Sequence, residues 1–178
     1  MVILVEGLHD QYFLQSYLEY LNITNVNVKY TNGKDGLKDH EREIVKNNNT
    51  KIIFDADDDL ELAKENIKNQ LGEELFAKCE IFLIPNNKDK GNLETLIENI
   101  AKEKCVLQCF DNYMECLKTL QEKNQNIKLP AKKSKVYAYN HSFGYKNGDE
   151  NYKIDNTYFD LESEYLEPLK SFLLSDES

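Results

Sequence analysis

Acidic side chains follow two short apolar segments of the sequence, and their placement predicts a metal site. The first segment is followed by Glu6 and then by Asp10. The second is followed by Asp55 and Asp57. If the two segments are neighbouring parallel strands, these carboxylates converge, and like charges raise one another's pKa unless cations lie among them. Hard oxygen ligands that leave coordination positions open suit Mg²⁺ (or Mn²⁺), which is the expected cofactor.

The simplest alternative for acids in such places is helix capping, because carboxylates are favourable at helix N-termini. Capping accounts well for Asp58 and Asp59, which directly precede a helical pattern. It accounts less well for Glu6 and Asp55, because each ends an apolar segment at the edge where open α/β sheets bind ligands. From the spacing alone, a metal site and simple capping both remain open.

Short apolar segments alternate with amphipathic ones over the first half of the chain. Strands are expected over residues 2–5, 26–30, 51–54 and 80–84. Helices are expected over residues 9–21, 37–46 and 60–71, after Asn92, and within the tail 161–174, which should pack on the sheet. This alternation predicts an α/β fold, with a doubly wound (Rossmannoid), mostly parallel sheet of about four strands flanked by helices.

The second half of the chain is richer in helix. We expect one domain over residues 1–178, with a core over about 1–103 and a helical C-terminal part over about 104–178. An amphipathic helix over 105–123 carries three of the four cysteines. We interpret these thiols as small buried side chains rather than metal ligands. Residues 136–139 alternate too briefly to distinguish helix from strand.

Composition excludes several classes of protein. The chain has 178 residues, 40% hydrophobic and 30% charged, with a mean hydropathy of −0.66. No apolar run approaches the roughly 20 residues of a membrane span, and the apolar start is too short for a signal peptide. The four cysteines form no paired framework. These features predict a cytoplasmic protein that does not act at a membrane.

The charge balance limits how this chain can bind nucleic acid. Lys and Arg number 22 against 32 Asp and Glu, a net charge of −10, whereas proteins that neutralise phosphates are usually basic. The single arginine is Arg42, so bidentate recognition of phosphate or guanine is nearly absent. DNA or RNA would be held through bound cations or a local basic patch. The densest patch, Lys132, Lys133 and Lys135, is first interpreted as a solvated helix face.

The order and spacing of the motifs resemble the Toprim (topoisomerase–primase) superfamily. The resemblance rests on an apolar strand ending in Glu6 and Gly7, with Asp10 following, and on a later strand ending in Asp55 and Asp57. Further segments are similar to small bacterial Toprim-related proteins close to the OLD (overcoming lysogenization defect) nucleases. These segments are residues 84–87, 91–94, 158–161, 168–170 and 172–173. Together they cover most of the chain.

The resemblance implies a role for each matching residue. Glu6 matches a glutamate that Toprim domains use as general acid or base and sometimes as a metal ligand. Asp55 and Asp57 match the pair that coordinates Mg²⁺. In OLD-type nucleases an aspartate matching Asp10 joins these ligands, and a later glutamate, matched by Glu94, completes a second metal site. Two metals would stabilise the attacking and the leaving oxygen in phosphodiester cleavage.

Lys88 and Lys90 are the predicted contacts to phosphate charge. They follow the fourth expected strand, on the same edge of the sheet as the carboxylates. A lysine there would neutralise developing negative charge, although solvated loop lysines are the simpler interpretation. Lys34, after the second strand, reaches that edge as well. Glu94 has a second interpretation, since near Asn92 it could simply complete a capping box.

Functions from different classes follow from these observations. The first is a metal-dependent nuclease or phosphodiesterase that cleaves DNA or RNA, in a setting of DNA repair or phage defence. The alternative is a catalytically silent Toprim-fold module acting with a partner such as a separately encoded ATPase, which the net charge of −10 favours. Hydrolysis of a smaller phosphate compound is a third option, because it avoids repulsion of a polyanion.

Overall fold

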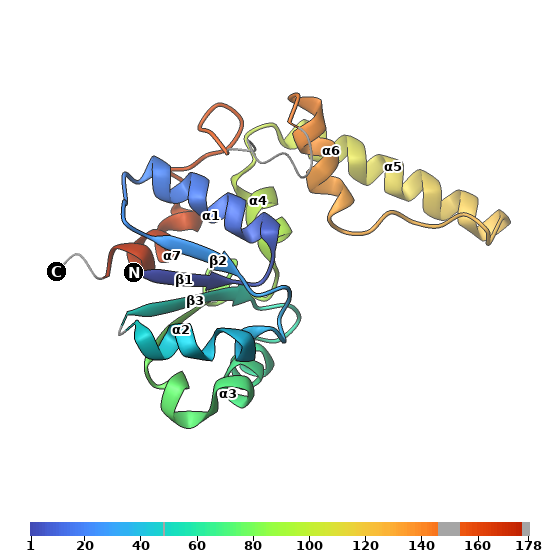
Figure 1. Cartoon of the computed structure of the whole chain (residues 1–178). Helices are drawn as coiled ribbons and strands as arrows, with labels where there is room; N and C mark the ends of the chain where they lie inside the picture. The colour runs from blue at the N-terminus through green and yellow to red at the C-terminus, as the bar shows by residue number, and fades with distance from the viewer. Residues whose placement is uncertain (48, 146–153, 176–178) are drawn as a thin grey trace.

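A four-stranded parallel sheet forms the centre of the computed structural model, which describes residues 1–47, 49–145 and 154–175 (Figure 1). The strand order is β2-β1-β3-β4, and every pairing is parallel. The strands are β1 Val2–Val5, β2 Asn27–Tyr30, β3 Thr50–Asp55 and β4 Cys79–Ile84. The predicted α/β fold with a Rossmann-like sheet is confirmed.

Helices cover both faces of this sheet. Alternate strand residues point to opposite sides, so that Ile3 lies in one core cluster and Leu4 in the other. One cluster joins the sheet to α1, α4, α6 and α7, and the other joins it to α2 and α3 (Figure 1). The helices on the two faces are α1 Leu8–Tyr20, α2 Glu41–Lys46, α3 Leu60–Phe76, α4 Leu93–Ile100, α6 Ser134–Ser142 and α7 Glu167–Leu174. Burial on both faces explains why the strands are nearly continuous apolar runs.

Two expectations about the C-terminal half are resolved by the structure. The ambiguous segment 136–139 lies in helix α6. The tail helix is shorter than expected, because Glu164–Leu166 forms a 3-10 turn and α7 starts only at Glu167. Pro168 stands in the first turn of α7, where its missing N–H costs no intrahelical hydrogen bond. The tail packs on the sheet as predicted, with the Phe172 ring 5.3 Å from that of Phe82.

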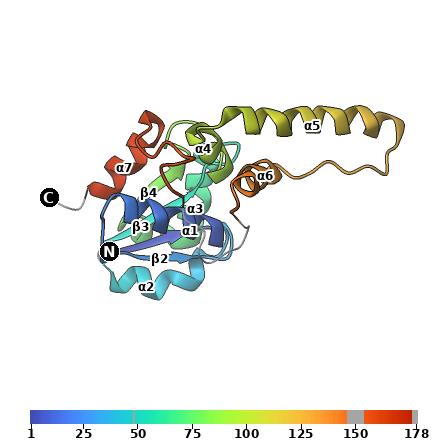
Figure 2. The same cartoon turned by 90° about the horizontal axis from the view of Figure 1, so that it is seen from above.

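Helix α5 (Lys104–Lys123) extends away from the sheet as an arm, and residues 124–133 return along it to α6 (Figure 2). The prediction that its thiols are buried is wrong, because Cys105, Cys109 and Cys116 are all exposed. The amphipathic pattern of α5 is real, but the helix stands off from the core that its apolar face was expected to enter. Among the described residues, no helix combines the length and the apolarity needed to cross a bilayer.

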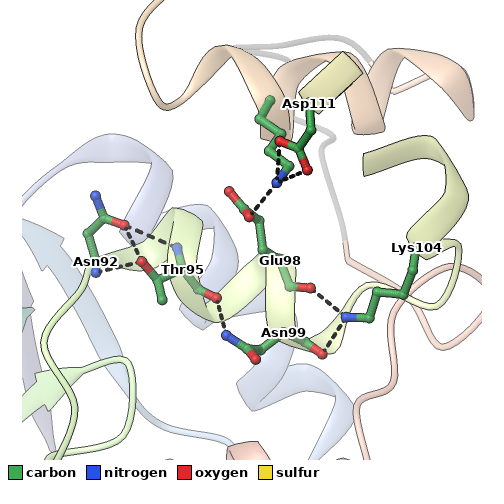
Figure 3. A network of polar contacts seen from close by, with 7 residues as sticks. Asn92, Thr95, Glu98, Asn99, Lys104 and Asp111 are labelled. Carbon is green, nitrogen blue, oxygen red and sulfur yellow. Dashed lines mark hydrogen bonds and ion pairs between the residues drawn. The ribbon is translucent and has the colours of Figure 1, made fainter. Parts of the chain in front are cut away.

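A polar network holds the base of the arm against α4 (Figure 3). Lys135 of α6 lies 3.0 Å from a carboxylate oxygen of Glu98 and 2.9 Å from one of Asp111, joining α4 to α5. Lys104 donates hydrogen bonds to the carbonyls of Glu98 and Asn99, at 2.5 and 2.8 Å. These are carbonyls that the end of a helix leaves without an intrahelical partner. Lys135 is therefore part of a structural network and not of a solvated basic patch.

Helix α7 is attached to the sheet through a buried lysine. Lys51 of β3 is 0% exposed, and its Nζ donates to the Phe172 carbonyl at 2.8 Å and to the Ser175 hydroxyl at 2.7 Å. Glu80 supplies a carboxylate oxygen at 3.1 Å. A charge this deeply buried is stabilised only by such partners.

We expect Lys51→Met to lower the free energy of unfolding by about 1–3 kcal/mol, because the methionine keeps the apolar stem but removes the charged donor that the Phe172 carbonyl, Ser175 and Glu80 share. Urea unfolding measures this change. Lys29→Met is the matched control, since it breaks a partly exposed ion pair with Glu43 and should cost less than about 1 kcal/mol. Equal losses in the two variants would contradict the special role of Lys51.

Candidate functional site

A cleft of about 470 Å³ opens at the carboxyl ends of β1 and β3. These strands are adjacent and parallel, so the residues that follow them reach the same edge of the sheet. The first turns of α3 form the opposite wall. The charged residues that line the cleft are Glu6, Lys34, Asp55, Asp57, Asp58 and Asp59. The strand adjacency that the metal-site prediction required is thus present.

Glu6 links the ends of the two strands. Its Oε1 accepts a hydrogen bond from the backbone N–H of Asp55 at 3.1 Å. Burial, followed by the negative charges of Asp10 and Asp57, raises the pKa of Glu6 from 4.5 to about 7, against the lowering effect of that hydrogen bond and of Lys34. A carboxyl group with a pKa near neutrality can accept or donate a proton at physiological pH.

Asp55 has the largest pKa shift of the cleft carboxyls. Its Oδ1 accepts a hydrogen bond at 3.0 Å from the N–H of Leu93, in the first turn of α4. Burial raises the pKa of Asp55 from 3.8 to about 9, and the charges of Asp10, Glu6 and Glu94 add to the rise. Without a cation, Asp55 therefore holds a proton at neutral pH.

Asp10 lies in the first turn of α1, behind Glu6. Its Oδ2 accepts a hydrogen bond from the backbone N–H of Gly7 at 3.0 Å, closing the start of the helix. A Cβ at position 7 would stand 3.0 Å from that oxygen, so the glycine leaves room for this contact. Burial raises the pKa of Asp10 to about 6, and the charge of Glu94 adds to the rise. Asp10 thus closes the start of a helix. It also belongs, with Glu6 and Asp55, to a group that we call the acidic cluster.

Asp57 stands apart from the buried carboxyls. Its backbone is left-handed, with φ of 50°, and its carbonyl accepts a hydrogen bond from Gly91 N–H at 2.8 Å. Its side chain is 55% exposed and lies 3.5 Å from Lys34 Nζ. Asp59 caps α3 through two backbone N–H groups, as predicted, whereas Asp58 is simply exposed. The negative charge of the cleft mouth therefore comes from Asp57 and Asp58.

Glu94 approaches the acidic cluster from α4. Its charge raises the pKa of both Asp10 and Asp55. The capping box of this helix is formed by Asn92 and Thr95, whose N–H donates to Asn92 Oδ1 at 3.1 Å (Figure 3). The interpretation of Glu94 as the capping-box residue is therefore wrong. Its side chain lines a separate cavity between α4, α5 and α6.

Of the three lysines expected at this edge of the sheet, one lines the cleft. Lys34 lines the cleft, beside Asp57. Lys88 lines a separate cavity together with residues of α7, and Lys90 is exposed outside the set that lines the cleft. The loop after β4 is turned by Asn86, whose Oδ1 accepts a hydrogen bond from the N–H of Lys88 at 3.1 Å. The structure thus brings Lys34 to the carboxylates, and a phosphate contact by Lys88 or Lys90 stays a prediction.

A family model described as "Protein of unknown function (DUF3226)" matches residues 1–175. The chain belongs to the DUF3226 family. The match spans every element from β1 to α7. No curated protein and no solved structure matches the chain. The Toprim and OLD resemblance of this DUF3226 chain stays a prediction from its motifs.

The acidic cluster of the DUF3226 chain fits a hard divalent cation by the chemistry of its donors, which are carboxylate oxygens. Within the described ranges, no three acidic, histidine or cysteine side chains are already arranged to enclose a metal ion. The contacts explain why. Glu6 and Asp55 each direct one oxygen to a backbone N–H, while Asp57 lies beside Lys34. The fit therefore lies in the type of donor and not in a preassembled shell.

The backbone N–H of Leu93 is the contribution that sequence reasoning missed. It orients Asp55 and brings the start of α4 to the ends of β1 and β3. The sequence does contain one indication of this close approach, which is Gly91. A Cβ at that position would come within 2.8 Å of the Thr95 hydroxyl. Glycine allows this loop to lie close to α4 and to bond the carbonyl of Asp57. A glycine directly before the N-cap Asn92 is therefore the feature to look for.

Proposed function

We propose that this chain is a Mg²⁺- or Mn²⁺-dependent phosphodiesterase of the Toprim type, with nucleic acid as its substrate class. The observation that carries the proposal is the convergence of Glu6, Asp10 and Asp55 at one sheet edge, with the pKa of all three raised. Carboxyl groups crowded into a cleft destabilise one another unless a cation or a proton lies among them. Perturbed carboxyls grouped in a cleft are typical of functional sites.

The roles follow from the contacts of each residue. Asp55 and Asp57 would hold the cation, with Asp10 and Glu94 in support. A bound divalent metal would supply Lewis-acid stabilisation to a phosphoryl oxygen. Glu6 is suited to move a proton at its Oε2, because its Oε1 is held by the N–H of Asp55.

Lys34 offers positive charge at the cleft mouth, where it now neutralises Asp57. Substrate phosphate would compete for this ammonium group, and the pairing with Asp57 would weaken as a cation takes over that carboxylate. The proposed assignment therefore transfers the phosphate-contact role from Lys88 and Lys90 to Lys34.

The net charge of −10, together with exposed Asp58 at the cleft mouth, favours a second candidate. This is a catalytically silent metal-binding module that works with a partner such as a separately encoded ATPase. The same charge is the reason to test a small phosphodiester beside nucleic acid, because repulsion grows with the number of phosphates.

The test is cleavage of supercoiled plasmid, single-stranded RNA and a small aryl phosphodiester, with Mn²⁺ or Mg²⁺, by the parent protein and by Asp55→Asn. Mn²⁺ binding is followed in parallel by electron paramagnetic resonance. We expect the parent to bind Mn²⁺ and cleave at least one substrate, and Asp55→Asn to cleave at least about 100-fold more slowly. Asp58→Asn is the matched control and should behave as the parent.

Binding of Mn²⁺ that Asp55→Asn weakens, without any cleavage, would replace the nuclease by the silent module. Absence of Mn²⁺ binding by the parent would overturn the metal site itself.

A further inference from the structure

The segment that returns from the tip of the arm to α6 is rich in lysine. We call residues 123–133, from the last residue of α5 to the start of α6, the basic limb (Figure 2). Between residues 123 and 145 the sequence has five lysines and neither Asp nor Glu, in a chain whose net charge is −10. The arm therefore has a basic side although the chain as a whole is acidic.

The lysines of the basic limb are exposed and, among the residues that the structure describes, have no ion-pair partner. They are Lys123, Lys128, Lys132 and Lys133. Their neighbours on the arm differ, because Lys118 lies 2.6 Å from Glu115 and Lys135 pairs with two carboxylates. A cluster of ammonium groups without carboxylate partners is the electrostatic footprint of a surface that binds phosphates.

The cavity between α4, α5 and α6 lies against this limb and has a volume of about 360 Å³. It is lined by Phe110 and Met114 of α5, Pro130 and Lys132 of the basic limb, and Glu94 of α4. The volume is in the range of pockets that hold small ligands. An aromatic ring beside an ammonium group suits single-stranded nucleic acid, because bases stack on the ring and phosphates pair with the cation.

Most carboxylates of this cavity are already neutralised by lysines of the arm. Lys135 pairs with both Glu98 and Asp111, at 3.0 and 2.9 Å (Figure 3). Lys118 pairs with Glu115 at 2.6 Å. The acids that line the cavity therefore oppose an anion less than their number suggests, and the charge of Lys132 stays available to it.

The first turn of α4 connects this cavity with the acidic cluster. Glu94 lines the cavity, and its charge acts on Asp10 and Asp55. The residue before it, Leu93, donates its N–H to Asp55 Oδ1 at 3.0 Å. A strand that occupies the cavity is thus next to the carboxylates at the ends of β1 and β3.

We propose that the basic limb and this cavity bind single-stranded nucleic acid and lead it to the acidic cluster. Phosphates lie along the limb lysines, and one base lies against Phe110. The inference rests on the proposed function, since it takes nucleic acid as the substrate. A duplex keeps its bases stacked and a membrane surface is flat, so neither can fill the cavity.

Binding is measured by fluorescence anisotropy of a labelled DNA single strand of about 12 nucleotides, in a chelator so that no metal-dependent cleavage occurs. Each phosphate contact to a single strand adds about 0.7 to the slope of log affinity against log salt. Four limb lysines therefore predict an affinity that falls about 50-fold between about 50 and about 200 mM salt. The corresponding duplex should bind at least about tenfold more weakly.

The limb variant combines the substitutions Lys128→Gln, Lys132→Gln and Lys133→Gln. We expect it to bind the strand at least about tenfold more weakly at about 50 mM salt and to lower the salt slope by about 2. The control variant removes the same charge at exposed positions in and just before α2, with Lys38→Gln, Arg42→Gln and Lys46→Gln. It should bind as the parent. All six side chains are exposed, and circular dichroism checks that both variants are folded.

Phe110→Ala tests the base contact separately. It should weaken binding at least about fivefold and leave the salt slope unchanged, because stacking releases no counterions. Tyr113→Ala is the matched control, since Tyr113 is a 50% exposed aromatic residue of the same helix that does not line the cavity. It should bind as the parent.

The binding surface and the proposed phosphodiesterase fail in different ways, because binding in a chelator requires neither metal nor cleavage. A parent that does not bind the strand, or a limb variant that binds as the parent does, would overturn the surface alone. So would equal affinity for the duplex, or binding to phosphatidylserine vesicles in place of the strand. Strand binding that the limb variant loses, in a parent that cleaves nothing with Mn²⁺ or Mg²⁺, would keep the surface and overturn the phosphodiesterase.

Discussion

Replacing Glu6 by Gln is expected to slow metal-dependent cleavage by about 10²–10⁴-fold, the usual contribution of a positioned acid or base. The amide oxygen of Gln can still accept the hydrogen bond from Asp55 N–H that now holds Oε1 at 3.1 Å. What the substitution removes is a proton-transfer group whose pKa is raised to about 7. Rates on the substrate that the parent cleaves, followed against pH, measure the effect.

Three further outcomes separate a proton-transfer role from a merely structural one. Mn²⁺ binding by Glu6→Gln should stay within several-fold of the parent, because Asp55, Asp57 and Asp10 remain. If Glu6 acts as the base, the parent's rate should rise with pH up to about 7, near its raised pKa, and the variant's residual rate should lack that rise. Glu6→Asp should recover part of the rate. A Glu6→Gln protein that cleaves as fast as the parent would remove Glu6 from the reaction.

Asp55→Asn should stabilise the metal-free protein at pH 8, by roughly 1–3 kcal/mol, or several degrees in Tm for a chain of this length. Burial and four neighbouring carboxylates, those of Asp10, Glu6, Glu94 and Asp57, raise the pKa of Asp55 to about 9. At pH 8 the fold must therefore keep a proton on Asp55 that the unfolded chain has already released, which is costly. Asn keeps the acceptor for Leu93 N–H and carries no charge. Thermal unfolding in the presence of a chelator measures the difference.

The sign of the pH dependence follows from the same shifts. The folded protein binds protons more tightly than the unfolded chain at Glu6, Asp10 and Asp55, whose pKa values rise to about 7, 6 and 9. The contribution of these groups to stability is greatest below about pH 4 and is lost as the pH rises toward 9. Asp55→Asn should flatten this loss, and Asp58→Asn, at an exposed acid of the same cleft, should not.

Adding Mn²⁺ at pH 8 should then raise the Tm of the parent and leave that of Asp55→Asn nearly unchanged, because ligands stabilise the state that binds them. A metal-free Asp55→Asn protein that is less stable than the parent would show that the charge of Asp55 is needed for folding.

Much of the fold could be predicted from local patterns in the sequence. Both faces of the sheet are buried, so the strands are near-continuous apolar runs that stop at Glu6 and at Asp55. Helices with a 3.6-residue period lie between them. A parallel sheet follows from this alternation, and with it the common edge for residues after the strands. These inferences use only residues that lie close together in the sequence.

The composition of the site depended on contacts between distant segments. The pairing of β1 with β3 is a long-range event, and without it Glu6 and Asp55 would not meet. The start of α4 reaches Asp55 through the Leu93 N–H. Of the lysines expected at this edge, Lys34 lines the cleft, whereas Lys88 lines another cavity. Sequence periodicity does not indicate such long-range contacts, because the path of a loop is set by turns such as the one at Asn86.

The sequence by itself determined the α/β class, the parallel sheet and the strand-end acids that define the candidate site, because periodic burial and helix or strand preference act over a few residues. Only the tertiary structure decided which acids are buried together, and hence which pKa values rise, because desolvation and charge repulsion depend on packing. It also decided that α5 is an arm with exposed thiols. An amphipathic helix looks the same in sequence whether its apolar face meets its own core or faces solvent.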